Sequence, residues 1–311
     1  MYCIFLIVYD THAMQLVECV PNFSEGRNKE TVDKIVSAIR SIEGVKILDQ
    51  EMDPDHNRSV VSFIAPPDAA RKAAFEGIKK ASELIDMTKH HGEHPRFGAS
   101  DVIPFIPISD VSMKDCVEIS RKLGEQVGKD LNIPVYMYGN SALLEARRNL
   151  EDIRNKNFQY EELSKSIGDD KWKPDYGPSL VGRAGASIIG SREALIAYNV
   201  NLNTTNLETG KKIARALRAK DGGLTFVKSL AFFIKEKNMV QISMNLTNFS
   251  KTPVYRAFEL VRVEALRYGI TIAESEVVGL IPMEAIVEAS RYYLQLNSFK
   301  SDQILEVRMM E

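Results

Sequence analysis

The stretch IDMTKHHGEHPRFGASD, residues 85–101, interrupts an alternation of helices and strands that runs through the rest of the chain. It holds three of the five histidines, and two glycines and a proline lie among them, which favours a loop over a helix or strand. The three histidines are His90, His91 and His94. Because histidine titrates close to neutrality, such a cluster on a loop indicates proton transfer or metal binding.

Three interpretations of this loop compete. His90, Glu93 and His94 match the zinc-hydrolase pattern H-x-x-E-H, but that pattern needs a helix, and Gly92 and Pro95 disfavour one here. A second interpretation is that these are solvated histidines without a function. The third, which we favour, is an acid/base site without metal, in which one histidine transfers protons and Glu93 or an aspartate orients it.

Working outward, a helix precedes the loop and a strand follows it. Pro66, Pro67 and Asp68 begin the helix, since proline is tolerated in a first turn, and we expect it to end near Leu84. The segment VIPFIPI, residues 102–108, follows the loop, and its prolines predict an edge or irregular strand.

Further out, the alternation continues on both sides. Apolar residues at helical spacing predict a helix after the capping residues Ser24 or Asn28 and another over residues 114–131. Apolar runs predict strands at 16–20, 45–48, 58–64 and 134–138, with a polar loop over 49–57. The resulting order, βαββα, loop, βαβ, is typical of a split βαβ arrangement.

Residues 143–166 interleave acidic and basic side chains and are expected to be helical with a solvated face. The next segment, 168–185, is broken repeatedly by glycine and proline and contains the only tryptophan, Trp172. It is interpreted as a loop that contacts a ligand rather than as a linker.

The rest of the chain repeats the pattern without a histidine, so the chemistry is expected in the first half. Strands are predicted at 184–190, 195–201, 225–234, 239–245 and 271–277, and helices at 206–219, 253–268 and 282–294. The predicted fold class is therefore α/β (α+β), with two subdomains, 14–190 and 191–311, each a split βαβ or ferredoxin-like mixed sheet with helices on one face.

Residues 1–13 open with an apolar run of about eight residues, too short to span a bilayer and without a basic leader. We expect a spurious or disordered leader before a start at Met14; the alternative is an extra edge strand.

Composition narrows the functional class. The 311 residues carry a net charge of −2, with 44% hydrophobic and 26% charged residues, as in a soluble globular protein without a generic nucleic-acid or membrane surface. The three cysteines, Cys3, Cys19 and Cys116, are far apart and indicate a reducing, cytoplasmic location. No GxGxxG, GxSxG or CxxC motif occurs, which disfavours nucleotide-fold oxidoreductases, α/β-hydrolases and thioredoxins.

Four carboxylates, Asp49, Glu51, Asp53 and Asp55, alternate along the expected polar loop. They lack the glycine and terminal glutamate of an EF-hand. Either they form a solvated turn, or one of them faces the histidine loop and orients an imidazole or meets a cationic substrate.

Several strings together resemble glutamate formimidoyltransferase, the formiminotransferase domain of the formimidoyltransferase-cyclodeaminase family. They are LVECVPNFSEGR (16–27), LIDMTKHHGEHPRFGASDVIPFIP (84–107), IPVYMYG (133–139), WKPDYGPS (172–179) and VGLIP (278–282). The resemblance covers nearly the whole chain, and the strings stand in the family's order.

This resemblance implies a transferase of one-carbon metabolism that moves the formimino group of N-formimino-L-glutamate to N5 of tetrahydrofolate in histidine degradation. It implies tetrahydrofolate as co-substrate, no metal, two subdomains meeting at a groove or tunnel, and a homodimer. The last histidine of HHGEH, His94, is implied as the catalytic acid/base. The implied folate-binding residues are Gly177, Pro178, Ser179, Leu180, Val181, Gly182, Arg183, Ala184 and Gly185.

Further residues suit this reaction by their chemistry. A carboxylate can stabilise the cationic formimino group, and an arginine, including Arg183, can hold a substrate carboxylate in a bidentate grip. The candidates for substrate binding or electrostatic support are Glu51, Asn57, Arg58, His90, Glu93 and Arg96. One imidazole can take the N5 proton and deliver it to the departing glutamate nitrogen, so a single histidine serves both half-reactions.

The chain departs from the family pattern at two places. Glu51 stands where family members carry aspartate, and residues 180–183 diverge and are one residue shorter, which leaves the pterin orientation open. The alternatives are a formyltransferase acting on glutamate and tetrahydrofolate at the same site, a folate-binding module without catalysis, and a zinc-dependent hydrolase. A cyclodeaminase would be a separate protein.

Overall fold

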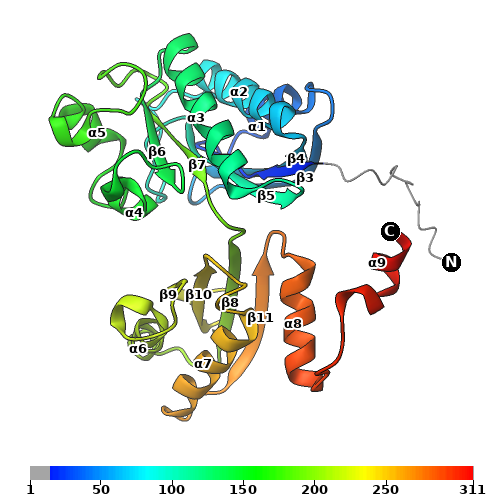
Figure 1. Cartoon of the computed structure of the whole chain (residues 1–311). Coiled ribbons are helices and arrows are strands. Elements are labelled where there is room, and N and C mark those ends of the chain that lie inside the picture. Colours follow the sequence, from blue (N-terminus) through cyan, green and yellow to red (C-terminus); the bar gives the residue numbers. More distant parts are fainter. Residues whose placement is uncertain (1–14, 311) are drawn as a thin grey trace. The chain divides into compact units, whose positions relative to one another are not determined.

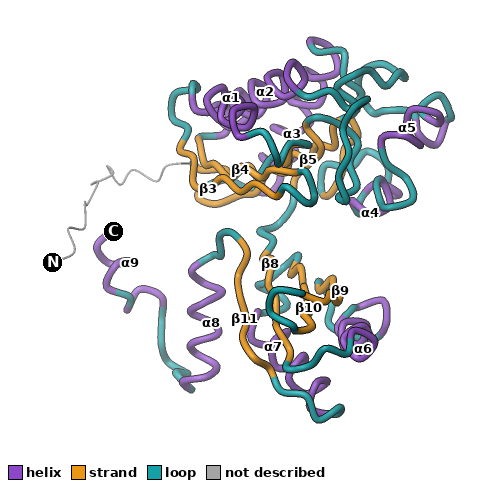
Figure 2. The backbone as a smooth tube through the Cα atoms, turned by 180° about the vertical axis from the view of Figure 1, so that it is seen from behind, coloured by secondary structure: helices purple, strands orange, loops and turns teal. Residues whose placement is uncertain are grey.

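The computed structural model describes residues 15–310, which divide into two compact units at Arg192 and Glu193 (Figures 1 and 2). Residues 1–13, expected to be a leader or an extra strand, lie outside the described residues. No helix between residues 15 and 310 is long and apolar enough to cross a membrane.

The N-terminal unit, residues 15–192, is built on a seven-stranded mixed sheet. Its strands are β1 (Leu16–Cys19), β2 (Asn22–Phe23), β3 (Lys46–Asp53), β4 (Arg58–Ala65), β5 (Ser100–Ser109), β6 (Val135–Gly139) and β7 (Ser187–Ser191). The short strands β1 and β2 both pair with β4 on one side and β5 on the other, while β3 lies outside β4. This is the predicted split βαβ order, extended by β7 and β6, which run parallel to β5.

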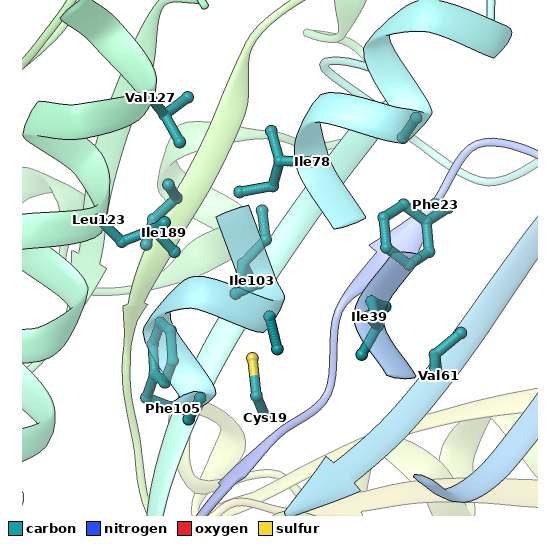
Figure 3. Packing of buried hydrophobic residues seen from close by; sticks show 14 of the residues in the cluster. Cys19, Phe23, Ile39, Val61, Ile78, Ile103, Phe105, Leu123, Val127 and Ile189 are labelled. Carbon is teal, nitrogen blue, oxygen red and sulfur yellow. The ribbon is translucent and has the colours of Figure 1, made fainter. Parts of the chain in front are cut away.

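Three helices cover one face of this sheet: α1 (Lys29–Arg40), α2 (Pro67–Leu84) and α3 (Met113–Asp130) (Figure 1). The Asn28 side chain accepts a hydrogen bond from Thr31 N and caps α1, as predicted. Figure 3 shows Ile39, Ile78 and Leu123 from these helices packed with residues of the strands, among them Ile103. Burial of these apolar side chains is the main favourable term for the unit.

Of the two alternatives predicted for residues 102–108, an edge or an irregular strand, the structure shows the second: β5 lies inside the sheet, and its pairing with β1 and β2 is irregular. Its prolines are tolerated at irregularities of the pairing. Pro107 lies opposite Val17, where the register shifts, and Pro104 falls at the junction between β1 and β2, where its carbonyl accepts from Val20 N.

The prediction of a polar loop over residues 49–57 is wrong for its first half. Strand β3 continues to Asp53, and only residues 54–57 form the turn to β4. Charged side chains are compatible with a strand here because they alternate with other residues and point away from the helices.

The expectation of one charged helix with a solvated face over residues 143–166 is also wrong. Short pieces replace it: η1 (Glu145–Arg147), α4 (Leu150–Ile153) and α5 (Tyr160–Ser166), followed by η2 (Asp170–Trp172). Ile153 and Leu163 of this segment are buried against the second face of β5, β6 and β7, with Tyr136 and Ile188. Trp172 belongs to the same layer and stacks on Phe158 with the ring centroids 3.9 Å apart.

The C-terminal unit, residues 193–310, carries a four-stranded antiparallel sheet in the order β11-β8-β10-β9. The strands are β8 (Ile196–Leu202), β9 (Val227–Ile234), β10 (Met239–Leu246) and β11 (Ile272–Val278). Its helices are α6 (Leu207–Leu217), α7 (Val254–Leu266), α8 (Met283–Leu294) and α9 (Leu305–Met310), with turns η3 (Ala219–Asp221) and η4 (Ser301–Gln303). Strand β10 lies between β8 and β9, so this unit is again a split βαβ fold, and the predicted fold class is confirmed.

Candidate active site

The histidine-rich stretch contains no helix or strand from Ile85 to Ala99, so the prediction of a loop is confirmed. Two glycines allow the histidine loop and the loop after β2 to lie close to the β3–β4 turn. A Cβ on Gly92 would lie 2.4 Å from the carbonyl oxygen of His56, and one on Gly26 would lie 2.1 Å from that of Asp53. Glycine at both positions therefore brings three segments together that are far apart in the sequence.

Asn57 links the same three segments. Its Oδ1 accepts from Gly26 N and its Nδ2 donates to the His91 carbonyl, both at 3.0 Å. Its φ of 49° lies in the left-handed region, which asparagine adopts more readily than most residues. Asn57 is buried, so it fixes the loops and is not exposed to a ligand.

His90 and Arg96 form a buried anchor under the loop. His90 Nε2 lies 3.0 Å from the Asn57 carbonyl, and His90 Nδ1 accepts from Arg96 Nε at 3.1 Å. Burial lowers the pKa of His90, so the ring is neutral. Arg96 uses its remaining four N–H groups on Gln159, on the His90 carbonyl and, at 2.6 and 2.9 Å, on Glu161. No ring nitrogen of His90 is left to bind a metal.

His94 lies half-buried beside the guanidinium of Arg58. Its Nε2 is 2.9 Å from Arg58 Nη1, so it accepts a hydrogen bond from the arginine. Burial, followed by the charges of Arg58 and Arg154, lowers the pKa of His94 to about 3. Near neutral pH this imidazole is uncharged and can accept a proton.

Arg58 reaches His94 because of the pleat of the sheet. Val61 and Phe63 of β4 point into the core under the helices, so Arg58 points to the other face. Asp53 and Glu51 of β3 pair with Arg58 and Val60 and share that face. Burial and the neighbouring carboxylate of Asp49 raise the pKa of Glu51, while Arg58 opposes the shift.

Asp101 and Arg154 form an ion pair behind His94, with 2.9 Å between Oδ2 and Nη2 and side chains that are 2% and 7% exposed. Asp101 Oδ1 also accepts from Phe97 N at 2.7 Å. Burial raises the pKa of Asp101, and Arg154 opposes this. Neither Arg154 nor Glu161 is distinguishable as a site residue in the sequence, because a charged run gives no sign of which of its members is buried.

The predicted folate loop, residues 177–185, ends against the histidine loop. The carbonyls of Arg183 and Ala184 accept from Met87 N and Ala99 N at 2.9 and 2.8 Å. Gly185 has a φ of 74°, and a Cβ there would lie 2.2 Å from the Phe97 carbonyl. At the middle of the loop the Leu180 side chain is 71% exposed, which leaves an apolar surface for a ring to cover.

The other predicted residues lie nearby with their polar groups less engaged. Glu93 is exposed and lines a cavity of about 570 Å³ beside the histidine loop. Arg183 of the folate loop has its Nε 3.7 Å from Asp86 Oδ2 of the histidine loop. The further lining residues are Arg27, Asp55, His56, His91 and Gly92. Among residues 15–310, no group of three His, Cys, Asp or Glu side chains is arranged to hold a metal ion.

Each of the two units matches a described protein family. Residues 16–192 match the family described as "Formiminotransferase domain, N-terminal subdomain", and residues 197–309 match the "Formiminotransferase domain". These ranges agree with the two compact units of the structure.

Curated relatives are similar to this chain over at least nine-tenths of its length. The chain is 64% identical to "Glutamate formimidoyltransferase" of Thermoplasma acidophilum, over 95% of this chain and 98% of the relative. It is 42% identical to the Streptococcus pyogenes protein of the same name, over 95% and 99% of the two chains. The "Formimidoyltransferase-cyclodeaminase" of Mus musculus is 42% identical over 90% of this chain and 52% of its own length.

Proposed function

The chain belongs to the formiminotransferase family, and from this membership we propose that it transfers the formimino group of N-formimino-L-glutamate to N5 of tetrahydrofolate. The products are 5-formimino-tetrahydrofolate and L-glutamate, as in histidine degradation. The observation that best supports this chemistry within the site is the neutral, half-buried His94 beside two arginines.

His94 is proposed as the acid/base of the reaction. When N5 attacks the amidine carbon, the neutral imidazole takes the N5 proton. The resulting imidazolium can give this proton to the glutamate nitrogen as the C–N bond to glutamate breaks. A substrate carboxylate that draws Arg58 away would free His94 Nε2 and raise its proton affinity, since an anion favours the charged ring.

The neighbouring residues are given different roles. Glu51 and Glu93 are proposed to stabilise the cationic formimino group, and Arg58 and Arg183 to meet substrate carboxylates. Asn57, His90 and Arg96 are proposed as positioning residues, since their polar groups are already engaged with protein atoms. Asn57 bonds to Gly26 and His91, and Arg96 bonds to His90 and Glu161.

The loop from Gly177 to Gly185, with Pro178, Ser179, Val181, Gly182 and Ala184, is proposed to hold tetrahydrofolate. Two features support this: the exposed Leu180, and backbone hydrogen bonds that join the end of the loop to residues 87 and 99 of the histidine loop. Tetrahydrofolate acts as a co-substrate, and the proposed chemistry uses no metal.

The test is a transfer assay with formiminoglutamate and tetrahydrofolate, following 5-formimino-tetrahydrofolate by absorbance. We expect turnover by the wild type with and without chelator, and a loss of about 10²-fold or more in His94→Ala, because general acid/base catalysis contributes this much. Circular dichroism checks that the variant is folded. Full activity in the variant, or turnover with formylglutamate alone, would contradict the proposal.

We further propose a homodimer in the cytoplasm. On α7 and α8 of the C-terminal unit, large apolar side chains are exposed, and a second copy would cover them. Among these are Val263, Leu266, Ile286, Tyr292 and Leu294. Sedimentation equilibrium measures the mass of the particle in solution, and a monomer at micromolar concentration would contradict the proposed homodimer.

A further inference from the structure

A second histidine lies near His94 and is oriented by a carboxylate. His56 is the third residue of the β3–β4 turn, and its Nδ1 lies 2.5 Å from Asp53 Oδ2. Asp53 Oδ1 accepts from the backbone N–H groups of Asp55 and His56, at 3.0 and 2.9 Å. The carboxylate is thus held by the turn itself, and it fixes the orientation of the imidazole and keeps a proton on Nδ1.

The other nitrogen of this ring is available. His56 Nε2 has no hydrogen-bond partner in the described part of the chain, and the side chain is 49% exposed. His56 lines the cavity of about 570 Å³, which His94 does not line. Its ring centroid is 6.3 Å from that of His94, and the ring planes are inclined at 76°.

His94, by contrast, is restricted. Its Nε2 is occupied by Arg58, and its low pKa keeps the ring unprotonated, which suits a base better than an acid. The charged groups around His56 are Asp53 and Asp55 on its own turn, Arg58 on β4, and Arg27 and Glu93 on the adjoining loops. A positioned imidazole beside a carboxylate is the arrangement expected of a group that donates protons.

We propose that His56, oriented by Asp53, is a second catalytic residue that protonates the departing glutamate nitrogen while His94 takes the N5 proton. This inference rests on the proposed function and assigns its two proton transfers to two rings instead of one.

The step balances without a further reactant. N5 of tetrahydrofolate forms a bond to the amidine carbon and loses its proton to His94. His56 enters this step protonated on both nitrogens, with its Nδ1–H donated to Asp53, and gives the proton on Nε2 to the glutamate nitrogen. The carbon–nitrogen bond to glutamate breaks with its electron pair leaving on that nitrogen, and His56 becomes neutral. The formimino group remains on N5, and the two rings regain their original protonation by exchange with water.

The experiment compares His56→Ala with Lys122→Ala, a control whose exposed side chain lies on α3 and pairs with Glu118. We expect kcat of His56→Ala to fall about 10²-fold with KM changed less than about 3-fold, since positioned proton donors contribute this much. Added imidazole should restore part of the lost rate in proportion to its concentration. Lys122→Ala should keep the wild-type kcat and show no response to imidazole. In Asp53→Asn the turn hydrogen bonds to Oδ1 can persist, and we expect a smaller loss of kcat.

Imidazole rescue separates catalysis from a structural role, because a distorted turn is not repaired by a free ring. A wild-type kcat in His56→Ala, or a folded but inactive variant that ignores imidazole, would overturn the inference and leave the proposed function standing. Absence of transfer by the wild type would overturn the proposed function, and this inference with it.

Discussion

The proton affinity of His94 is set by burial and by two neighbouring guanidinium groups, Arg58 and Arg154. Replacing Arg58 by methionine removes one cation beside the imidazole, so we expect the pKa of His94 to rise by about 1–2 units from its value of about 3. Titration of the histidine ring signals by NMR measures this. Arg27→Met is the control and should leave the pKa of His94 unchanged; an unchanged value in Arg58→Met would show that burial alone sets it.

Asp101 compensates the buried positive charges behind His94. Removing its charge in Asp101→Asn leaves Arg154 buried without a counterion, and we expect the free energy of unfolding to fall by about 3 kcal/mol or more. Asp68→Asn breaks an exposed ion pair with Lys72 and should cost less than about 1 kcal/mol. Urea titration compares the two, and equal effects would contradict the assigned role of Asp101.

At the level of residues, sequence could suggest some of the site and not the rest. His94 is identified by its position within HHGEHPR through a family resemblance, and the sequence pattern locates the turn that ends at Asn57 and leads into Arg58. Arg154 and Glu161 could not be found, because their burial depends on how residues 143–166 pack on the second face of the sheet.

At the level of elements, the folate loop and the histidine loop are joined where Gly185 meets Phe97. A methyl group in Gly185→Ala would overlap the Phe97 carbonyl, so we expect a loss of stability of more than about 2 kcal/mol and weaker tetrahydrofolate binding. Gly222→Ala is the matched control, since Gly222 also has a positive φ, of 95°, but has nothing within 4 Å of the added Cβ. It should cost only about 1 kcal/mol.

Thermal melting and a binding titration measure the two effects. If both variants lost the same stability, the positive φ alone would explain the loss, and the close contact between the two loops would not contribute to it.

The elements that sequence predicted well are those with a local signal. Helix α1 follows its cap at Asn28, and α2 begins at its proline, as expected. The prolines of β5 allow an edge strand or an irregular one, and only the tertiary pairing shows that both prolines fall at irregular positions inside the sheet. The same limit explains residues 143–166, whose charge pattern gives no sign of the sheet that they cover.

For the whole molecule, the low pKa of His94 links stability to pH. The folded pKa of about 3 lies below the ordinary value of 6.5, so this contribution to stability is fully present above pH 6.5. This contribution is lost as pH falls from 6.5 toward 3, because the unfolded chain binds a proton at this position and the native chain does not. The free energy of unfolding then falls by up to about 1.4 kcal/mol per pH unit. His94→Gln should unfold with a shallower pH dependence in urea titrations between pH 6.5 and 4. Identical slopes would contradict this assignment.

The two units share the split βαβ order, yet the C-terminal one contains no histidine. The proposed acid/base residues all belong to residues 15–192, on loops and strand ends on the side of the sheet opposite α1, α2 and α3.

The five N–H groups of Arg96 are all bonded to protein atoms, and this has a consequence for ligand binding. They tie the histidine loop to residues 159–161 before any substrate arrives. Ordering the backbone of one residue costs about 1–2 kcal/mol in conformational entropy, and for this loop the entropy is lost when the chain folds and not when a ligand binds. Two small, flexible substrates then meet a surface that is already fixed, so the free energy of their contacts is kept for affinity and alignment.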